Sequence, residues 1–132
     1  MTDERLRVKI EDYVRAVARL GEGLEEDLSN PLVYDGVIQR FEFTYELAWK
    51  CLKAYLEREG LQPASTPRAV FKEAFASGFL PDGDVWIDMI DDRNLTVHTH
   101  NDSLARQIYQ HVKERYYPAL ADLARALAEA VS

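Results

Sequence analysis

The sequence lacks the features that would place it in a disulfide-bonded, zinc-cluster or membrane class. It has 132 residues and one cysteine, Cys51, which excludes an internal disulfide and a cysteine-rich zinc cluster. No stretch approaches the roughly 18 apolar residues of a membrane span, and the charged residues 1–5 lack the apolar core of a signal peptide. We therefore expect a cytoplasmic protein with no membrane segment.

The common nucleotide-binding loops are also missing. The chain has no G-x-G-x-x-G fingerprint and no G-x-x-x-x-G-K-[ST] loop, which excludes a dinucleotide fingerprint and a P-loop. Gly21 and Gly23 come closest, but they follow a predicted helix rather than a strand. We expect no cofactor.

Basic residues are in the minority. The 16 lysines and arginines face 23 aspartates and glutamates, which gives a net charge of −7. This balance argues against broad binding to a phosphate backbone, which depends on lysine and arginine. We expect no binding to DNA, and any contact with RNA or a nucleotide to be local.

Apolar residues recur every three or four positions, which is typical of amphipathic helices. Thr66 and Pro67 are a helix start, and Gly60 and Gly78 are helix ends. Pro118 falls inside the last helix and should kink or split it. The sequence thus predicts one all-α domain over residues 1–132, an antiparallel bundle of about five helices, four long and one short. The expected helices cover residues 6–28, 34–60, 66–78, 84–98 and 101–131.

The second predicted helix is apolar on more than one side, so we expect it at the centre, with Phe43 and Cys51 adding to its apolar surface. Glu42, Glu46 and Lys50 stand four apart and predict a stabilising ladder along this helix. The aromatic residues at helical spacing could stack a base, but core positions are the favoured interpretation. These residues are Phe41, Tyr45, Trp49 and Trp86.

The densest polar cluster spans residues 88–102. Asp88, Asp91 and Asp92 share one helical face, which suits either a divalent cation or, as we favour, solvent, because no second acidic motif completes a coordination sphere. His98 and His100 could reach a metal, but the sequence offers no further ligands for it. We predict no metal site.

Within this cluster, Arg93 and His98 are more specific candidates for a functional site than the aspartates or the two histidines as metal ligands. Arginine can bind a phosphate with two prongs and histidine can move protons near neutral pH, which together suit metal-independent RNA cleavage through the 2′-hydroxyl. Five residues of straight helix would separate the two side chains by about 140° and 7.5 Å of rise. Either the helix ends before His98, or two copies of the chain share one cleft. A purely structural arginine, with a histidine favoured by a helix C-terminus, is the alternative.

Three stretches resemble the nucleotidyltransferase substrate-binding branch of the HEPN superfamily. They are residues 35–50, residues 66–74 and residues 86–98, the last of which contains an R-x4-H motif. The resemblance implies a helical bundle that forms a homodimer and associates with a minimal nucleotidyltransferase. In related members the motif forms a metal-independent ribonuclease site at the dimer interface, and in toxin-antitoxin pairs the HEPN chain is the toxin.

Carried onto this sequence, the resemblance predicts Arg93, Asn94 and His98 as catalytic residues, with Asp92 and His100 as substrate contacts. His100 stands where members silenced by adenylylation have the acceptor tyrosine, so the resemblance does not carry that route of silencing to this chain. The chain lacks the Gly-Ser and D-x-D elements of a nucleotidyltransferase and is not expected to be the transferase itself. A nucleotide-binding module without catalysis, or a purely structural helical dimer, are the alternatives.

Overall fold

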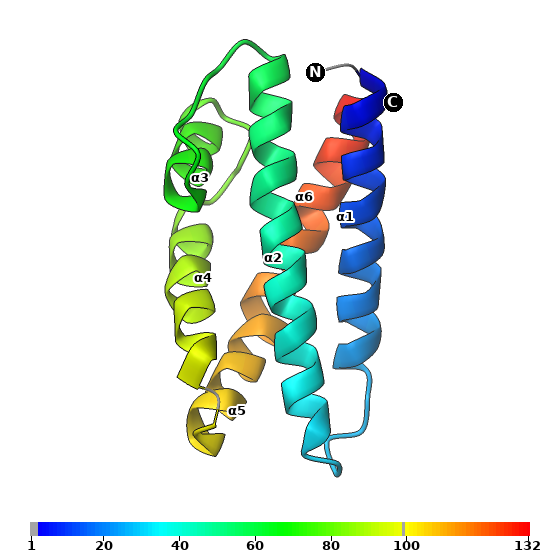
Figure 1. Cartoon of the computed structure of the whole chain (residues 1–132), viewed down its shortest axis with the longest axis vertical. Coiled ribbons are helices and arrows are strands. Elements are labelled where there is room, and N and C mark those ends of the chain that lie inside the picture. Colours follow the sequence, from blue (N-terminus) through cyan, green and yellow to red (C-terminus); the bar gives the residue numbers. More distant parts are fainter. Residues whose placement is uncertain (1–2, 99) are drawn as a thin grey trace.

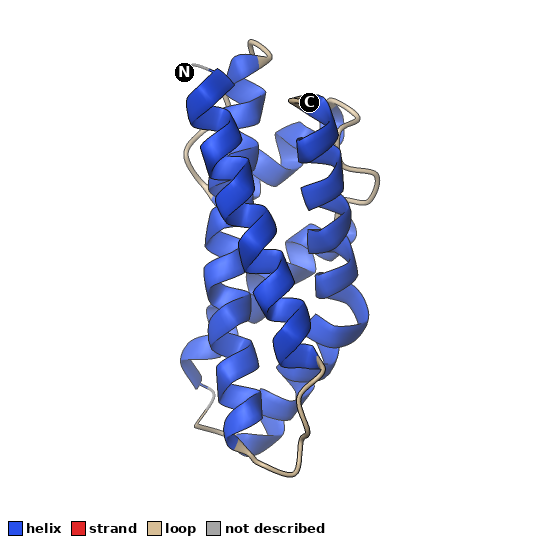
Figure 2. Ribbon diagram, turned by 90° about the vertical axis from the view of Figure 1, so that its right-hand side faces the viewer, coloured by secondary structure: helices blue, strands red, loops and turns tan. Residues whose placement is uncertain are grey.

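The computed structural model describes residues 3–98 and 100–132, which contain helices and no strand (Figure 2). Met1 and Thr2 of the charged N-terminal stretch, and Thr99 of the polar cluster, lie outside the described residues. A 3-10 turn, Thr96–His98, follows α4 (Asp84–Leu95), and a π-helical turn, Val112–Tyr116, joins α5 (Asp102–His111) to α6 (Tyr117–Ala130). The predicted all-α bundle is confirmed, and its last helix consists of α5, the π turn and α6. The helices are α1 (Asp3–Leu24), α2 (Leu32–Arg58), α3 (Pro67–Ala76), α4 (Asp84–Leu95), α5 (Asp102–His111) and α6 (Tyr117–Ala130).

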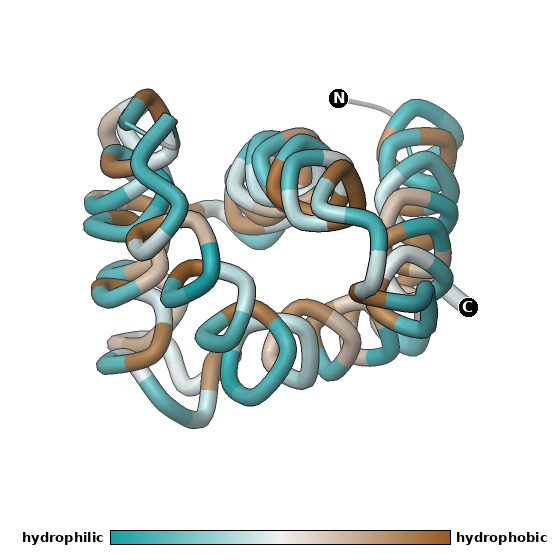
Figure 3. Tube along the Cα trace, turned by 90° about the horizontal axis from the view of Figure 1, so that it is seen from below, coloured by the Kyte–Doolittle hydropathy of each residue, from teal (hydrophilic) through white to brown (hydrophobic). Residues whose placement is uncertain are grey.

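The arrangement centres on α2. Seen along the bundle, α2 stands between α1 on one side and the column of α3 and α4 on the other (Figure 3). The joined α5 and α6 cross behind α2, from the foot of α4 to the side of α1 (Figure 1). This central position agrees with the apolar residues that α2 carries on more than one side.

The helix boundaries follow from local signals in the sequence. The side chain of Thr66 accepts a 3.2 Å hydrogen bond from the backbone N–H of Ala69, directly before Pro67 at the first turn of α3. Gly60 and Gly78 adopt left-handed backbone angles, with φ of 88° and 85°, just beyond α2 and α3. These predicted start and stop signals are confirmed.

Pro118 changes the helix type instead of ending the helix. It has no N–H to donate to the carbonyl four residues earlier, so the preceding turn widens. The N–H of Tyr117 donates to the carbonyl of Val112, five residues back, which is the bond of a π turn. The predicted split near Pro118 is confirmed, and it lets α6 reach α1, where the Tyr13 hydroxyl donates to the Leu120 carbonyl at 2.6 Å.

Aromatic side chains fill much of the core. Phe41 stacks on Tyr116 with ring centroids 5.7 Å apart, and Phe71 packs against Trp86 at 4.8 Å. Phe43 differs from the expectation, because 62% of it is exposed. It lies two residues, or about 200° of helical turn, from the buried Phe41 and therefore faces the other way.

Cys51 is fully buried at the centre of α2, as expected of a core thiol. Burial raises the pKa of this thiol to about 12.

Among the described helices, none combines the length and the apolar character needed to cross a membrane.

Candidate functional site

The R-x4-H residues lie where α4 changes into a 3-10 turn. The hydroxyl of Thr96 donates to the carbonyl of Arg93 at 2.7 Å, and Nη1 of Arg93 donates back to Oγ1 of Thr96 at 3.2 Å. Thr96 is buried, and its side chain thereby fixes the end of the helix. Since α4 ends at Leu95, the helix does end before His98, which is one of the two arrangements that the spacing allows.

The guanidinium of Arg93 turns toward α2. Its Nη1 lies 3.5 Å from Oε2 of Glu42, and its Nε is buried without a hydrogen-bond partner among the described residues. A buried donor without a partner is costly. The Arg93 side chain as a whole is 27% exposed, so an oxyanion can meet its terminal nitrogens, while Nε itself is closed to a ligand in this conformation. The arrangement therefore suits an anionic group such as a phosphate.

Asn94, His98 and His100 are exposed beside this arginine. The rings of His98 and His100 lie nearly perpendicular, with centroids 6.2 Å apart. Within the described part of the chain, no hydrogen bond or ion pair joins His98 to Arg93. The structure places the motif residues at one end of α4 without linking them directly.

Asp92, the residue before Arg93, belongs to a different polar cluster. Its Oδ2 accepts a 2.7 Å hydrogen bond from the hydroxyl of Tyr116 and lies 2.7 Å from Nδ1 of His111. Burial and this hydrogen bond raise the pKa of Tyr116 well above its usual range. One turn earlier, Asp88 pairs with Arg115 at 2.9 Å. Part of the predicted acidic face is thus used to tie α4 to the π turn.

A groove of about 760 Å³ runs beside Arg93, between α1, α2 and α4. Arg19 from α1, Arg40 from α2 and Arg93 from α4 all line it, although the chain is acidic overall. Arg40 is held in place by its Nη1, which donates to the carbonyl of Arg19 at 2.6 Å. The other lining residues are Ala16, Gly36, Gln39, Glu42, Phe43, Thr44 and Glu46.

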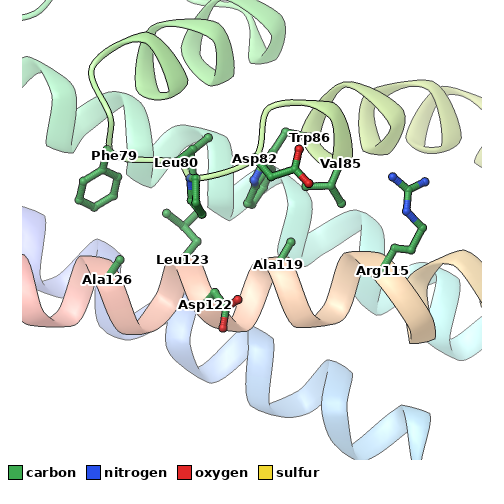
Figure 4. A pocket seen from close by; sticks show the side chains of 11 residues that line it. Phe79, Leu80, Asp82, Val85, Trp86, Arg115, Ala119, Asp122, Leu123 and Ala126 are labelled. Atoms are coloured by element: carbon green, nitrogen blue, oxygen red, sulfur yellow. The ribbon is translucent and has the colours of Figure 1, made fainter.

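A second hollow, of about 540 Å³, lies between α6 and the segment that leads into α4 (Figure 4). Leu80 and Trp86 face Ala119 and Leu123 across it. None of the predicted site residues lines this apolar hollow. It stands apart from the arginine groove.

The described residues contain no group of three or more histidine, cysteine, aspartate or glutamate side chains arranged to hold a metal ion. Of the three carboxylates that share the acidic face, Asp88 pairs with Arg115 and Asp92 accepts a hydrogen bond from Tyr116, so two of them are engaged by side chains of the π turn.

Glu42, Arg19 and Arg40 were not predicted as parts of this site. Of the expected ladder on α2, Glu46 does pair with Lys50, at 3.7 Å, but Glu42 faces Arg93 instead. No spacing in the sequence relates these residues to the end of α4. These residues come together only in the folded chain, from α1, α2 and α4. The one property visible in the sequence that relates them to an anion site is their charge.

Comparison with known families gives a match over most of the chain. Residues 8–129 match the family described as "Nucleotidyltransferase substrate binding protein like". A protein of Haemophilus influenzae named "Probable ribonuclease HepT" is 30% identical over 96 residues, or 67% of this chain. The match spans 66% of that relative's own length, just under two thirds.

Two solved structures share the fold. A crystal structure of a Thermus thermophilus protein has a TM-score of 0.74 and 39% identity, covering 90% of this chain and 98% of its own. A Haemophilus influenzae protein, described as having the fold of a substrate binding domain of a nucleotidyltransferase, has a TM-score of 0.70. At 22% identity over 96% of this chain and 99% of its own, that likeness concerns the fold alone. On the match over residues 8–129, the chain belongs to the nucleotidyltransferase substrate binding protein-like family.

Proposed function

We propose that this chain is a non-transferase, substrate-binding subunit that pairs with a minimal nucleotidyltransferase and carries a metal-independent, toxin-type ribonuclease site in the cytoplasm. The observation that carries the ribonuclease proposal is the end of α4 at Leu95, between Arg93 and His98, which lets a partly buried guanidinium and an exposed imidazole flank one substrate. Membership of the substrate binding family supports the partnership. The relative named as a probable ribonuclease supports the chemistry.

In the proposed reaction, His98 removes the proton from an RNA 2′-hydroxyl, and the resulting oxygen attacks the adjacent phosphorus. The bond from phosphorus to the 5′-oxygen breaks, which leaves a 2′,3′-cyclic phosphate and a 5′-hydroxyl. Arg93 stabilises the extra negative charge on the phosphoryl oxygens. Asn94 orients one of these two groups.

A homodimer would complete this site, because the departing 5′-oxygen needs a proton that a second His98 can supply. Exposed apolar residues next to the motif support such an interface: Leu95 is 40% exposed and Val97 is 69% exposed. Exposed apolar side chains that lie together can mark a surface that a partner covers. The arrangement puts one Arg93 and one His98 from each copy around a shared cleft.

Asp92 and His100 are proposed as substrate contacts. His100 is exposed and its ring lies near His98, so it can meet a base or ribose beside the cleaved bond. Asp92 can reach a ligand only at the edge of its cluster, because Tyr116 and His111 occupy Oδ2 and the side chain is 13% exposed.

RNA cleavage in EDTA by the purified chain tests the ribonuclease. Wild type should cut single-stranded RNA, and Arg93→Ala and His98→Ala should each lower the rate by about 100-fold or more. Arg125→Ala, which removes an exposed arginine of α6, is the matched control and should keep the rate. If wild type is as inert as the two variants, the nuclease proposal fails.

The partnership is tested separately. The nucleotidyltransferase encoded in the neighbouring reading frame, recognised by Gly-Ser followed by D-x-D, should co-purify with this chain at a fixed ratio. Failure of the two to associate would remove the subunit role and leave the nuclease proposal standing.

A nucleotide-binding module without catalysis is the second candidate. The observation in its favour is that Arg93 pairs with Glu42 in the groove and, among the described residues, makes no hydrogen bond or ion pair with His98. Calorimetric titration with ATP would then give saturable binding by a chain that cleaves no RNA.

A further inference from the structure

We propose that the groove lined by Arg19, Arg40 and Phe43 binds single-stranded RNA next to the R-x4-H site, with the arginines on its phosphates and Phe43 stacked on an unpaired base. The proposal rests on the proposed ribonuclease, since that activity needs a strand led to Arg93. It adds a strand-binding surface built from α1 and α2, which the motif does not contain.

The charges of the groove favour an anion. Neither Arg19 nor Arg40 pairs with a carboxylate within the described part of the chain, although acidic residues outnumber basic ones overall. Of the two glutamates that line the groove, Glu46 lies near Lys50 and accepts a 3.1 Å hydrogen bond from Nε1 of Trp49. The uncompensated positive charge therefore sits at the α1 and α2 side of the groove.

Arg40 is preorganised for this role. One terminal nitrogen is fixed on the carbonyl of Arg19, while the other stays available to a phosphate oxygen. Gly23 makes room for it, because a Cβ at that position would lie 3.3 Å from Nη1 of Arg40. An arginine that is already ordered loses less side-chain entropy when it binds.

Phe43 gives the groove an aromatic face. It is 62% exposed and lies one turn beyond Gln39 and Arg40 on the same side of α2. Near the other end, a Cβ at Gly36 would meet no atom of the described residues within 4 Å apart from its chain neighbours and its own helix backbone, so the floor there is open. Proteins that bind single strands combine basic side chains with exposed aromatics, because every base has a face on which to stack.

Glu42 is compatible with this ligand. Its distance of 3.5 Å from Nη1 of Arg93 is longer than a normal charged hydrogen bond, so the pair is loose. A phosphate at the terminal nitrogens of Arg93 would replace this contact.

The test measures binding to an RNA that cannot be cleaved. Fluorescence anisotropy would use a labelled, 2′-O-methylated single strand of about 12 nucleotides, a length within the range that such grooves cover. The missing 2′-hydroxyl separates binding from cutting, so a chain without ribonuclease activity can still confirm the groove. The variants are Arg19→Gln and Phe43→Ala, whose side chains are exposed, with Arg7→Gln of α1 as the control.

Arg19→Gln should weaken binding about tenfold and reduce the slope of log affinity against log salt by about 0.7, as expected for one lost phosphate contact. Phe43→Ala should weaken binding about tenfold without changing that slope, since stacking releases no counterions. Arg7→Gln should change neither.

Four results would overturn the proposal. The first is no binding of the strand even at low salt. The second is binding that Arg19→Gln and Phe43→Ala leave at the wild-type level. The third is displacement of the strand by ATP at equal concentration, which would make the ligand a free nucleotide. The fourth is a Phe43→Ala chain that binds RNA normally but halves in mass by analytical ultracentrifugation, which would assign Phe43 to contacts between copies.

Discussion

The hydroxyl of Tyr116 donates a 2.7 Å hydrogen bond to the carboxylate of Asp92, across 24 residues of sequence. The bond joins the π turn to the residue directly before Arg93, and so connects the special geometry forced by Pro118 to the end of α4. The motif arginine therefore depends on a turn that lies far from it in the chain.

Tyr116→Phe tests this connection. The substitution removes a donor from a largely buried carboxylate and should lower the free energy of unfolding by about 1.5 to 3 kcal/mol, the usual range for hydrogen bonds to charged groups. Tyr109→Phe is the control, because the Tyr109 hydroxyl is buried without a partner among the described residues, so its loss should be neutral or stabilising. Urea denaturation measures both, and equal losses would contradict the role of the bond.

Gly36 and Gly60 should respond in opposite directions to alanine. Gly36 lies inside α2, where an added Cβ would meet no described residue within 4 Å beyond its chain neighbours and its own helix backbone. Gly36→Ala should therefore stabilise the helix by about 0.5 to 1 kcal/mol. Gly60 has a φ of 88°, a left-handed conformation, and Gly60→Ala should cost about 1 to 2 kcal/mol. Thermal unfolding followed by circular dichroism checks the two signs, and a loss at both positions would contradict the open floor of the groove.

Much of the fold could be predicted because its signals are local. Thr66 with Pro67, Gly60, Gly78 and Pro118 each act through backbone chemistry within one or two turns. Helical spacing likewise separates most buried from exposed positions.

The candidate site could be predicted only where its residues are close in sequence. Arg93 and His98 lie on one segment, and the resemblance covers them. The contact of Glu42 with Arg93, and the placement of Arg19 and Arg40 beside them, depend on how α1, α2 and α4 pack. Phe43 is a similar case. In a helix with apolar residues on several sides, the sequence does not show that the side carrying Phe43 faces solvent.

Cys51 should make stability depend on pH in the alkaline range. Burial raises the pKa of its thiol from 9.0 to about 12, so the unfolded chain releases this proton first as pH rises. The contribution of the protonated thiol to the free energy of unfolding is therefore fully present below pH 9. It is lost progressively as pH rises toward 12, at up to about 1.4 kcal/mol per pH unit. Cys51→Ala should show a shallower fall between pH 9 and 10, measured by urea denaturation at each pH; parallel curves would contradict the assignment.

Glu42→Gln should strengthen RNA binding. The carboxylate competes with phosphate for Arg93, and a partly exposed ion pair of this kind contributes roughly 0.5 to 1 kcal/mol, so its removal should raise affinity about threefold. Glu46→Gln is the matched control one turn along α2: its carboxylate contacts Lys50 and Trp49, and affinity should change less. Anisotropy with the 2′-O-methylated strand distinguishes the two. Weaker binding by Glu42→Gln would mean that Glu42 positions Arg93 for the ligand rather than competing with it.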